Sequence, residues 1–290
     1  MSDVSNKVSN KVSGKVTDKV SGKVSGTVSG KVTGKVATLA TYHSLKGKRV
    51  FITGGGSGIG AAIVEAFAAQ GAQVAFVDIA DAASEALCAR LAAAGLPRPV
   101  FSHCDITDID ALQRVMAAMA AQCGDFDVLV NNAANDGRHN FADVTVADWD
   151  ARIAVNQRPM FFTCQAVAPA MQRNGGGAII NISSISWHIK GAGYPVYATA
   201  KAAVVGLTRG LARELGAHGI RVNTVTPGWV MTARQLELWV NEEAELEIDR
   251  SQCLPDRLMP GHIAAMVMFL AADDGAMCTA QEFVVDAGWS

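Results

Sequence analysis

The segment Thr53-Gly-Gly-Gly-Ser-Gly-Ile-Gly60 follows a short apolar run, Arg49–Thr53, and opens a stretch with helical periodicity, Gly58–Gln70. Glycines permit a tight turn and let backbone N–H groups approach a pyrophosphate, whose negative charge the helix N-terminus favours. A glycine-rich turn between a strand and a helix is the dinucleotide-binding fingerprint of a Rossmann fold. The segment therefore predicts a parallel α/β domain that binds a dinucleotide.

Short apolar runs and helical stretches alternate along the rest of the chain. The expected strands are Arg49–Thr53, Gln73–Asp78, Val100–His103, Asp127–Asn131, Ala178–Ser183, Ile220–Val225 and Glu282–Val285. The expected helices are Gly58–Gln70, Asp81–Ala94, Asp108–Gln122, Ala147–Gln172, Pro195–His218 and Gly261–Ala272. This alternation predicts one doubly wound, parallel, seven-stranded sheet with helices on both faces. We expect a single domain over residues 45–290, with a substrate lid at about residues 230–257.

Residues 1–36 form a low-complexity repeat, roughly Lys-Val-Ser-Gly, in which valine recurs every four residues. On a helix these valines drift and form no fixed apolar stripe, so we expect a disordered tail over residues 1–40. Two interpretations stay open for it: a neutral product of repeat expansion or of a misplaced start site, and a lysine-rich tether for an anionic surface.

Charge and cysteine content exclude several classes of protein. Residues 1–40 carry seven lysines and two aspartates, and the remainder carries 18 basic and 25 acidic residues. The body is therefore mildly acidic, with no basic field for nucleic acid, and no apolar run approaches the length of a membrane span. The six cysteines are scattered and no metal-ligand motif occurs, so we expect free thiols, no metal and a cytoplasmic location. The N-terminus also has no apolar signal-peptide core.

The second expected strand ends in Asp78, eighteen residues after Gly60. A carboxylate at this point accepts hydrogen bonds from the adenosine ribose hydroxyls and repels a 2′-phosphate. No Arg or Lys occupies residues 54–60 or 77–83, where such a phosphate would lie. Asp78 therefore predicts NAD rather than NADP, the alternative being a role as a strand-end turn residue or helix cap.

Tyr197 and Lys201 are four residues apart in an expected helix, and Ser184 lies thirteen residues before Tyr197. Residues i and i+4 share one helix face, so we expect the ammonium to lower the Tyr197 pKa. Tyr197 would then exchange a proton with an alcohol or carbonyl oxygen. The spacing also arises by chance on helix surfaces, but the upstream fingerprint favours the catalytic interpretation.

Together these motifs resemble the short-chain dehydrogenase/reductase family. The resemblance runs from about Leu45 to the C-terminus and rests on the glycine-rich turn, Asn131-Asn132-Ala133-Ala134, Asn156, Ser184, Tyr197-x-x-x-Lys201 and Pro227-Gly228, in that order. Ala134 departs from the family pattern, which often has glycine there; a small residue should serve equally well.

The resemblance implies a role for each matching residue. Tyr197 is the catalytic acid/base, Lys201 binds the nicotinamide ribose, Ser184 binds the reacting oxygen, and Asn156 holds a water that links Lys201 to solvent. The implied cofactor residues are Gly54, Ser57, Gly58, Ile59, Gly60, Asp78, Asp105, Ile106, Asn132, Ala133, Tyr197, Lys201, Pro227, Gly228, Val230 and Thr232. The family also implies a homotetramer.

Several further segments look like the bacterial NAD-dependent aldose 1-dehydrogenases of this family, which act on sugars such as D-xylose and D-galactose. They are Asn135-Asp-Gly-Arg-His139, Ser186-Trp-His188, Gln252-Cys-Leu254 and Asp286-Ala-Gly-Trp289. A sugar site needs fixed polar groups and flat apolar surfaces. The candidate substrate residues are Asn135, Asp136, Arg138, His139, Trp187, His188, Tyr194, Trp229 and Gln235.

The implied reaction is hydride transfer from C1 of an aldose to NAD⁺, which yields the aldonolactone. The alternative is a dehydrogenase or reductase of another secondary alcohol or ketone, including 3-oxoacyl thioesters. An acyl-carrier partner would require a basic site mouth, whereas the expected lid is acidic. A cofactor-binding module without catalysis is disfavoured by the intact set of Ser184, Tyr197 and Lys201.

Overall fold

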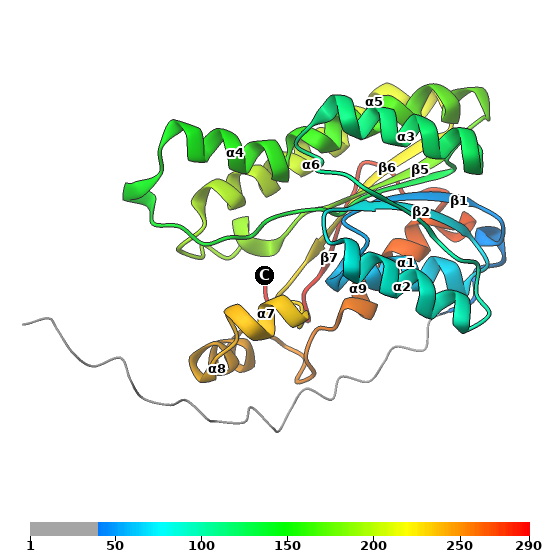
Figure 1. Cartoon of the computed structure of the whole chain (residues 1–290). Coiled ribbons are helices and arrows are strands. Elements are labelled where there is room, and N and C mark those ends of the chain that lie inside the picture. The colour runs from blue at the N-terminus through cyan, green and yellow to red at the C-terminus, as the bar shows by residue number, and fades with distance from the viewer. Residues whose placement is uncertain (1–39) are drawn as a thin grey trace, which may run out of the picture. The chain divides into compact units, whose positions relative to one another are not determined.

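The computed structural model describes residues 40–290 (Figure 1). The tail expected over residues 1–40 lies, apart from Ala40, outside this part of the chain. Within the described residues, seven strands form one sheet in the order β3-β2-β1-β4-β5-β6-β7, and every neighbouring pair is parallel. The strands are β1 Arg49–Thr53, β2 Gln73–Asp78, β3 Val100–His103, β4 Val128–Asn131, β5 Gly177–Ile182, β6 Ile220–Pro227 and β7 Glu282–Val285. The predicted doubly wound sheet is confirmed.

Helices cover both faces of the sheet (Figure 1). The helices are α1 Gly58–Ala69, α2 Asp81–Ala93, α3 Ile109–Cys123, α4 Val146–Asn156, α5 Arg158–Arg173, α6 Pro195–Leu215, α7 Ala233–Leu238, α8 Glu242–Ser251 and α9 Pro260–Ala271. None of the helices in the described part is long and apolar enough to cross a membrane.

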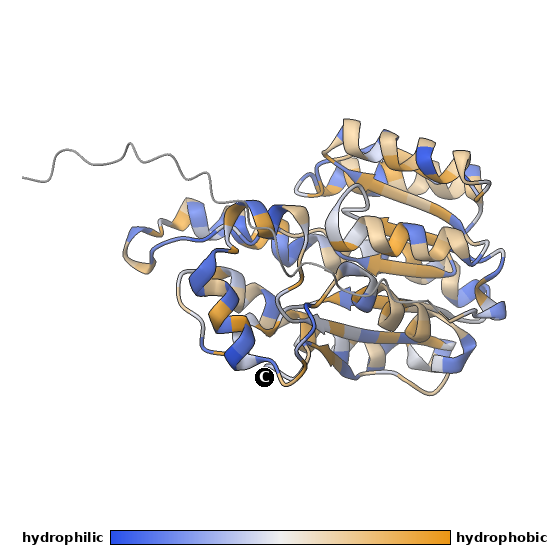
Figure 2. Ribbon diagram, turned by 90° about the horizontal axis from the view of Figure 1, so that it is seen from below, coloured by the Kyte–Doolittle hydropathy of each residue, from blue (hydrophilic) through white to orange (hydrophobic). Residues whose placement is uncertain are grey.

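Two apolar cores lie on opposite sides of the sheet, because successive side chains of a strand alternate between its faces. Val50 and Ile52 of β1 pack in one core with α1, α2 and α9. Phe51, between them, packs in the other core with α3, α5 and α6. Figure 2 shows the apolar strands enclosed between helix layers that carry both polar and apolar residues. Strands buried on both faces are expected to be continuously apolar, which explains their sequences.

The single helix expected over Ala147–Gln172 is wrong. Two helices, α4 and α5, occupy this stretch and are separated at Gln157, whose φ/ψ of −134°/−55° is not helical. Pro159 lies in the first turn of α5, where its missing N–H breaks no helical hydrogen bond. In an unbroken helix it could not donate to the Val155 carbonyl four residues earlier, and its ring would clash there, so the helix breaks before it. Asn156, the last residue of α4, is fully buried at this break.

Residues 230–257, the expected lid, contain α7 and α8, which lie at the same end of the sheet as α4 (Figure 1). Arg257 is buried, and its guanidinium donates to Glu245 at 2.9 Å and to Asp249 at 2.7 Å. Two of the carboxylates that make this segment acidic are therefore paired with a buried arginine, which fixes α8 to the end of the segment.

Candidate active site

The expected site residues gather at the carboxyl edge of the sheet, where β1 and β4 are neighbours but their connections run in opposite directions. Ligands of doubly wound folds bind at such a point, because the loops that follow the two strands diverge and leave a crevice. β1 ends in the glycine-rich turn, β4 ends in Asn131, and β5 ends just before Ser184.

The glycine-rich turn leaves no space for side chains. A Cβ on Gly60 would lie 1.8 Å from the Gly54 carbonyl oxygen, and one on Gly56 would lie 2.4 Å from Ser84 Oγ. Gly54 also has a φ of +69°, in the left-handed region that favours glycine. No side chain therefore covers the backbone at these glycines, as close approach of a pyrophosphate requires.

Helix α1 begins at this turn without a side-chain cap. Its N-cap, Ser57, makes no side-chain capping hydrogen bond, and its first turn contains no acidic residue. The N–H groups at the start of α1 therefore remain available for an anion. Ile59, in the first turn, packs against the core, and the Thr232 methyl group lies 3.3 Å from the position of a Cβ on Gly58. The site thus fits a dinucleotide pyrophosphate.

Asp78 lies at the end of β2 and accepts two backbone hydrogen bonds. Gly56 N donates to its Oδ2 at 2.8 Å, and Ala80 N donates to its Oδ1 at 2.9 Å. The carboxylate therefore lies directly beside the glycine-rich turn, as the sequence predicts for a group that meets an adenosine ribose. The turn role considered as an alternative is present as well, since Asp78 orients the loop that follows β2.

The ends of β3 and β4 border the same region. Asp105 follows β3 and accepts hydrogen bonds from Thr107, while the neighbouring Ile106 is buried. Asn132 donates to the carbonyls of Thr53 and Gly54 at 3.1 and 2.9 Å. These contacts tie the end of β4 to the glycine-rich turn. Ala133 lies in the same junction, where its N–H donates to Thr53 Oγ1 at 3.1 Å.

The segment that follows β6 closes this side of the site. Gly228 N donates to Val285 O at 2.9 Å, and a Cβ on Gly228 would lie 2.7 Å from the Asp286 Cα. Pro227, the last residue of β6, and Val230 are buried. Thr232 caps α7 by accepting from Gln235 N, so residues 227–232 lead from the sheet to the expected lid.

Lys201 is almost completely buried, with 1% of its surface exposed. Its Nζ donates to the carbonyl oxygen of Ile182 at 2.9 Å, and Ser183 Oγ donates to the Lys201 carbonyl at 2.8 Å. Both contacts join the middle of α6 to the end of β5. Burial lowers the Lys201 pKa to about 8, because a desolvated ammonium is disfavoured.

The expected lowering of the Tyr197 pKa is wrong for this structure. Burial raises the pKa, as does the negative charge of Asp136, and these effects exceed the opposite effect of the hydrogen bond with Ser184. Lys201 Nζ lies 5.7 Å from the Tyr197 ring centre and is directed at a carbonyl instead. The structure nevertheless brings Ser184, Tyr197 and Lys201 together as predicted.

Asn156 fixes the chain after β4. Its Oδ1 accepts from Asn135 N at 2.8 Å, and its Nδ2 donates to the carbonyls of Asn135 and Arg152, both at 3.0 Å. The break between α4 and α5 therefore positions the loop that begins at Asn135. The Asn135 side chain accepts from Gly137 N and tightens this loop.

The expected substrate residues of this loop contact the expected lid. Asp136 accepts from Gln235 and Arg234 of α7, and Gln235 in turn accepts from the Trp229 indole. The Arg138 guanidinium lies over the Trp239 ring, 4.5 Å from its centre. The loop after β4 and the expected lid thus form one continuous wall of the expected site.

The remaining candidate substrate residues contact the start of α6 or the strand β7. Tyr194 is edge-on to Tyr197 at 6.4 Å between ring centres. His139 Nε2 accepts from Val196 N, which fixes the start of α6. Trp187 stacks on His188, whose Nε2 lies 3.0 Å from Glu282 Oε1.

Sequence reasoning missed a buried polar network beneath the site. Asn131 donates to Asn181 at 2.9 Å, Asn181 donates to Thr208 at 3.0 Å, and the Thr224 hydroxyl donates to the Thr208 hydroxyl at 2.7 Å. Thr163 of α5 also donates to Asn131. The signal was present in the sequence, because asparagines interrupt apolar strands where only a partnered amide is tolerated.

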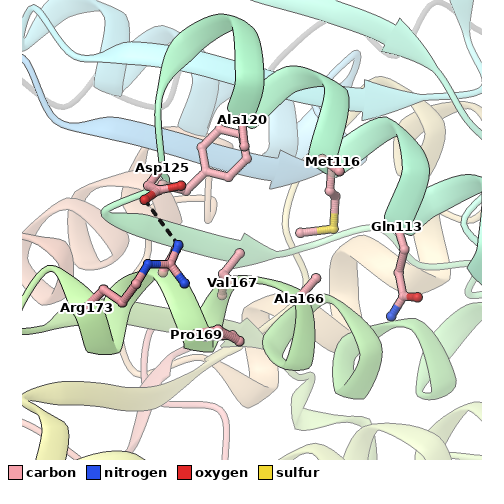
Figure 3. Close-up of a pocket in the computed structure, with 11 residues that line it drawn as sticks. Gln113, Met116, Ala120, Asp125, Ala166, Val167, Pro169 and Arg173 are labelled. Atoms are coloured by element: carbon pink, nitrogen blue, oxygen red, sulfur yellow. Dashed lines mark ion pairs between the residues drawn. The ribbon is translucent and has the colours of Figure 1, made fainter.

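Of two pockets in the described residues, one is bordered by the candidate substrate residue His188 and the other by no predicted site residue. One of about 510 Å³ is bordered by His188 and Lys190, by Glu247 and Ser251 of α8, and by Trp289 near the C-terminus. The other, of about 230 Å³, lies between α3 and α5 and carries an Asp125–Arg173 ion pair (Figure 3). None of the predicted site residues lines the second pocket, so we assign the chemistry to the carboxyl edge.

Known proteins share this arrangement. A family model described as enoyl-(acyl carrier protein) reductase matches residues 54–290. The chain is 55% identical over 250 residues to the D-xylose 1-dehydrogenase of Caulobacter vibrioides, which covers 86% of this chain and 98% of that protein. The chain belongs to the short-chain dehydrogenase/reductase family. A probable galactose dehydrogenase of Rhizobium meliloti, another relative, is 46% identical over 247 residues, or 85% of this chain and 96% of that protein.

Solved structures place this short-chain dehydrogenase/reductase among nicotinamide-dependent enzymes. A 7α-hydroxysteroid dehydrogenase with bound NADH and 7-oxo glycochenodeoxycholic acid has a TM-score of 0.81 and 32% identity, and the match covers 86% of this chain and 96% of that one. A blue fluorescent protein from a metagenomic library, bound to NADPH, has a TM-score of 0.78 and 37% identity, with coverage of 85% and 99%. The chain is an oxidoreductase of a family that binds a nicotinamide cofactor.

Proposed function

We propose that this dehydrogenase oxidises an aldose, such as D-xylose or D-galactose, at C1 and releases the aldonolactone. The identity of 55% to a D-xylose 1-dehydrogenase over nearly all of that protein carries the proposal. The walls of the site support it: Asp136, Gln235 and Trp229 are joined by hydrogen bonds, and Tyr194 lies edge-on to Tyr197. Fixed polar groups beside flat aromatic surfaces suit a polyhydroxylated ring.

The chain's own residues suggest the steps. We place the anomeric hydroxyl between Ser184 and Tyr197, where Ser184 stabilises the reacting oxygen and Tyr197 takes its proton. A bound nicotinamide would supply the acceptor for the hydride that leaves C1. Lys201 and a water held by Asn156 are proposed to carry the proton towards solvent. Tyr197→Phe in a correctly folded protein should abolish turnover; wild-type turnover would exclude this assignment.

We propose NAD⁺ as the preferred cofactor. Asp78 is fixed beside the glycine-rich turn by two backbone N–H groups, and a 2′-phosphate would face its negative charge. Gly54–Gly60 and Asn132–Ala133 would hold the pyrophosphate and adenosine ribose, and Pro227, Gly228, Val230 and Thr232 would border the nicotinamide half. A higher kcat/KM with NADP⁺ than with NAD⁺ would contradict the proposal.

The decisive experiment measures NADH formation across a panel of aldoses. D-Xylose, D-galactose and their epimers form one arm, and simple secondary alcohols form the second. The reverse reduction of a 3-oxoacyl thioester tests the alternative. We expect turnover of at least one pentose or hexose at a kcat/KM well above that of every simple alcohol. Efficient thioester reduction with negligible sugar oxidation would overturn the proposal.

Assembly and location remain proposals drawn from the family resemblance. We propose a homotetramer, which light scattering coupled to size-exclusion chromatography would reveal as about four times the chain mass of 30.3 kDa. We also propose a cytoplasmic location, which agrees with the free cysteines of the described residues. Cell fractionation would test it.

A further inference from the structure

A continuous hydrogen-bond chain runs from the loop after β4 to the lid. The Trp229 indole Nε1 donates to Gln235 Oε1 at 2.9 Å, and Gln235 Nε2 donates to Asp136 Oδ2 at 2.5 Å. These two hydrogen bonds can run in one direction only, because an indole N–H only donates and a carboxylate only accepts. The Gln235 amide is thereby held in one orientation, and Asp136 determines the orientation of an indole that it does not touch.

Two further contacts join the same loop to the lid. Arg234 Nε donates to Asp136 Oδ1 at 3.2 Å, although this arginine side chain is 56% exposed. The Arg138 guanidinium lies 4.5 Å from the Trp239 ring centre and 5.8 Å from that of Trp229. A cation over an indole face is attracted by the ring's negative charge density. The contacts of Asp136 and Arg138 with Trp229, Arg234, Gln235 and Trp239 are called the clasp below.

The clasp lies beside the catalytic pair. The loop that carries Asp136 also contacts the start of α6, because His139 N donates to Gly193 O at 2.7 Å and His139 Nε2 accepts from Val196 N at 3.3 Å. The negative charge of Asp136 raises the pKa of both Tyr197 and Lys201. Thr232, at the start of α7, contacts the Gly58 position of the nucleotide turn. Helix α7 therefore extends between the expected cofactor and the loop after β4.

We propose that Asp136 is a positioning residue that acts through Gln235 to fix the Trp229 indole and to hold α7 closed beside Tyr197. This inference rests on the proposed function, since Trp229 is the flat surface offered to a sugar ring. Asp136 has both carboxylate oxygens engaged by α7, which assigns it to the lid rather than to a sugar hydroxyl.

Three variants test the proposal. Asp136→Asn removes the charge at constant size, Gln235→Ala interrupts the chain, and Trp229→Phe keeps a flat ring without the indole N–H. We expect Gln235→Ala to raise KM for the sugar about tenfold while kcat changes little. Asp136→Asn should raise KM by a similar factor without a loss of kcat, because removing its charge also removes one of the effects that raise the Tyr197 pKa. Glu237→Gln, at an exposed position on the same helix, is the matched control and should leave both constants unchanged.

A double-mutant cycle separates this role from general loosening of the site. In Gln235→Ala/Trp229→Phe the two effects on KM should be strongly non-additive, because both variants remove the hydrogen bond from the Trp229 indole to Gln235. Additive effects would overturn the proposal, as would a loss of kcat with unchanged KM in Asp136→Asn.

Hydrogen exchange provides a readout that needs no substrate. We expect the amides of Ala233–Leu238 to exchange at least about fivefold faster in Asp136→Asn and Gln235→Ala than in wild type, with α9 unchanged. Equal exchange in folded variants would overturn the proposal whatever the substrate is. If the aldose panel fails while α7 exchange rises, the proposed function is wrong and the clasp stands.

Discussion

The Lys201 ammonium donates a hydrogen bond to the Ile182 carbonyl oxygen, 2.9 Å away at the end of β5. The contact satisfies a buried charge with a backbone dipole and holds Nζ 5.7 Å from the centre of the Tyr197 ring. Burial lowers the pKa of Lys201 to about 8 and raises the pKa of Tyr197.

Sugar oxidation should depend on pH in two phases. Only deprotonated Tyr197 accepts a proton, and its raised pKa means that this form increases about tenfold per pH unit below the pKa. Lys201 keeps its charge below about pH 8 and loses it above. We therefore expect kcat/KM to rise towards pH 8 and to level off beyond it. Steady-state kinetics from pH 6 to 10 test this.

Lys201→Arg provides the control for that profile, because a guanidinium stays charged throughout the range. Its turnover should be lower, since the geometry differs, but the bend near pH 8 should disappear. A bend that persists in Lys201→Arg would show that another group causes it.

Folding stability should also depend on the charge of Lys201. The folded pKa, about 8, lies below the ordinary value of 10.5, so burying the ammonium costs free energy below pH 8. The cost is relieved as pH rises from 8 to 10.5, because the unfolded lysine is still protonated there. Relative to Lys201→Met, wild type should gain about 2 kcal/mol between pH 7 and 9.5. Urea unfolding at both pH values measures this, and parallel changes in the two proteins would contradict it.

Cofactor choice should respond to Asp78→Asn, which removes the charge and keeps an acceptor oxygen for one of the two N–H groups, those of Gly56 and Ala80, that now bind different carboxylate oxygens. Loss of repulsion should raise the ratio of kcat/KM for NADP⁺ to that for NAD⁺ by about tenfold, or about 1.4 kcal/mol. Asp81→Asn, at an exposed residue three positions on, is the matched control. An equal change in both variants would mean that net charge alone is responsible.

The buried network should be sensitive to Thr208→Val. The change keeps the side-chain shape but leaves the Asn181 amide and the Thr224 hydroxyl without their partner. We expect a loss of about 2–4 kcal/mol in the free energy of unfolding, since each unsatisfied buried group costs about 1–3 kcal/mol. Thr199→Val, on the exposed side of the same helix, should change it by less than about 0.5 kcal/mol. Similar losses in the two variants would show that replacing a threonine hydroxyl anywhere in α6, not breaking the network, is responsible.

The strands could be predicted well because strong local signals coincide with burial on both faces. The expected β1, β2, β3 and β7 have the observed limits. The break at Gln157 was missed because apolar spacing continues through it; Pro159 was the signal, and it acts through backbone geometry rather than hydropathy.

The residues that form the site could be predicted from the sequence, but their pKa values could not. Glycines, Asp78, Ser184, Tyr197 and Lys201 occur at spacings that the fold brings to one edge. The pKa of Tyr197 depends on burial and on Asp136, which is 61 residues away in sequence, so the i, i+4 spacing was insufficient. The clasp likewise joins residues about 98 positions apart, a distance over which no local pattern exists.

Strand β4 has residues with different roles at its two ends. Asp127, just before the strand, accepts two hydrogen bonds from the Arg49 guanidinium at 2.9 Å, whereas Asn131 at its other end anchors the polar network beneath the site. The four-residue strand Val128–Asn131 therefore spans the whole distance between a structural ion pair and the polar network beneath the site. Directed evolution of new specificity should therefore concentrate its libraries on the loops that follow Asn131 and leave Arg49 and Asp127 unchanged.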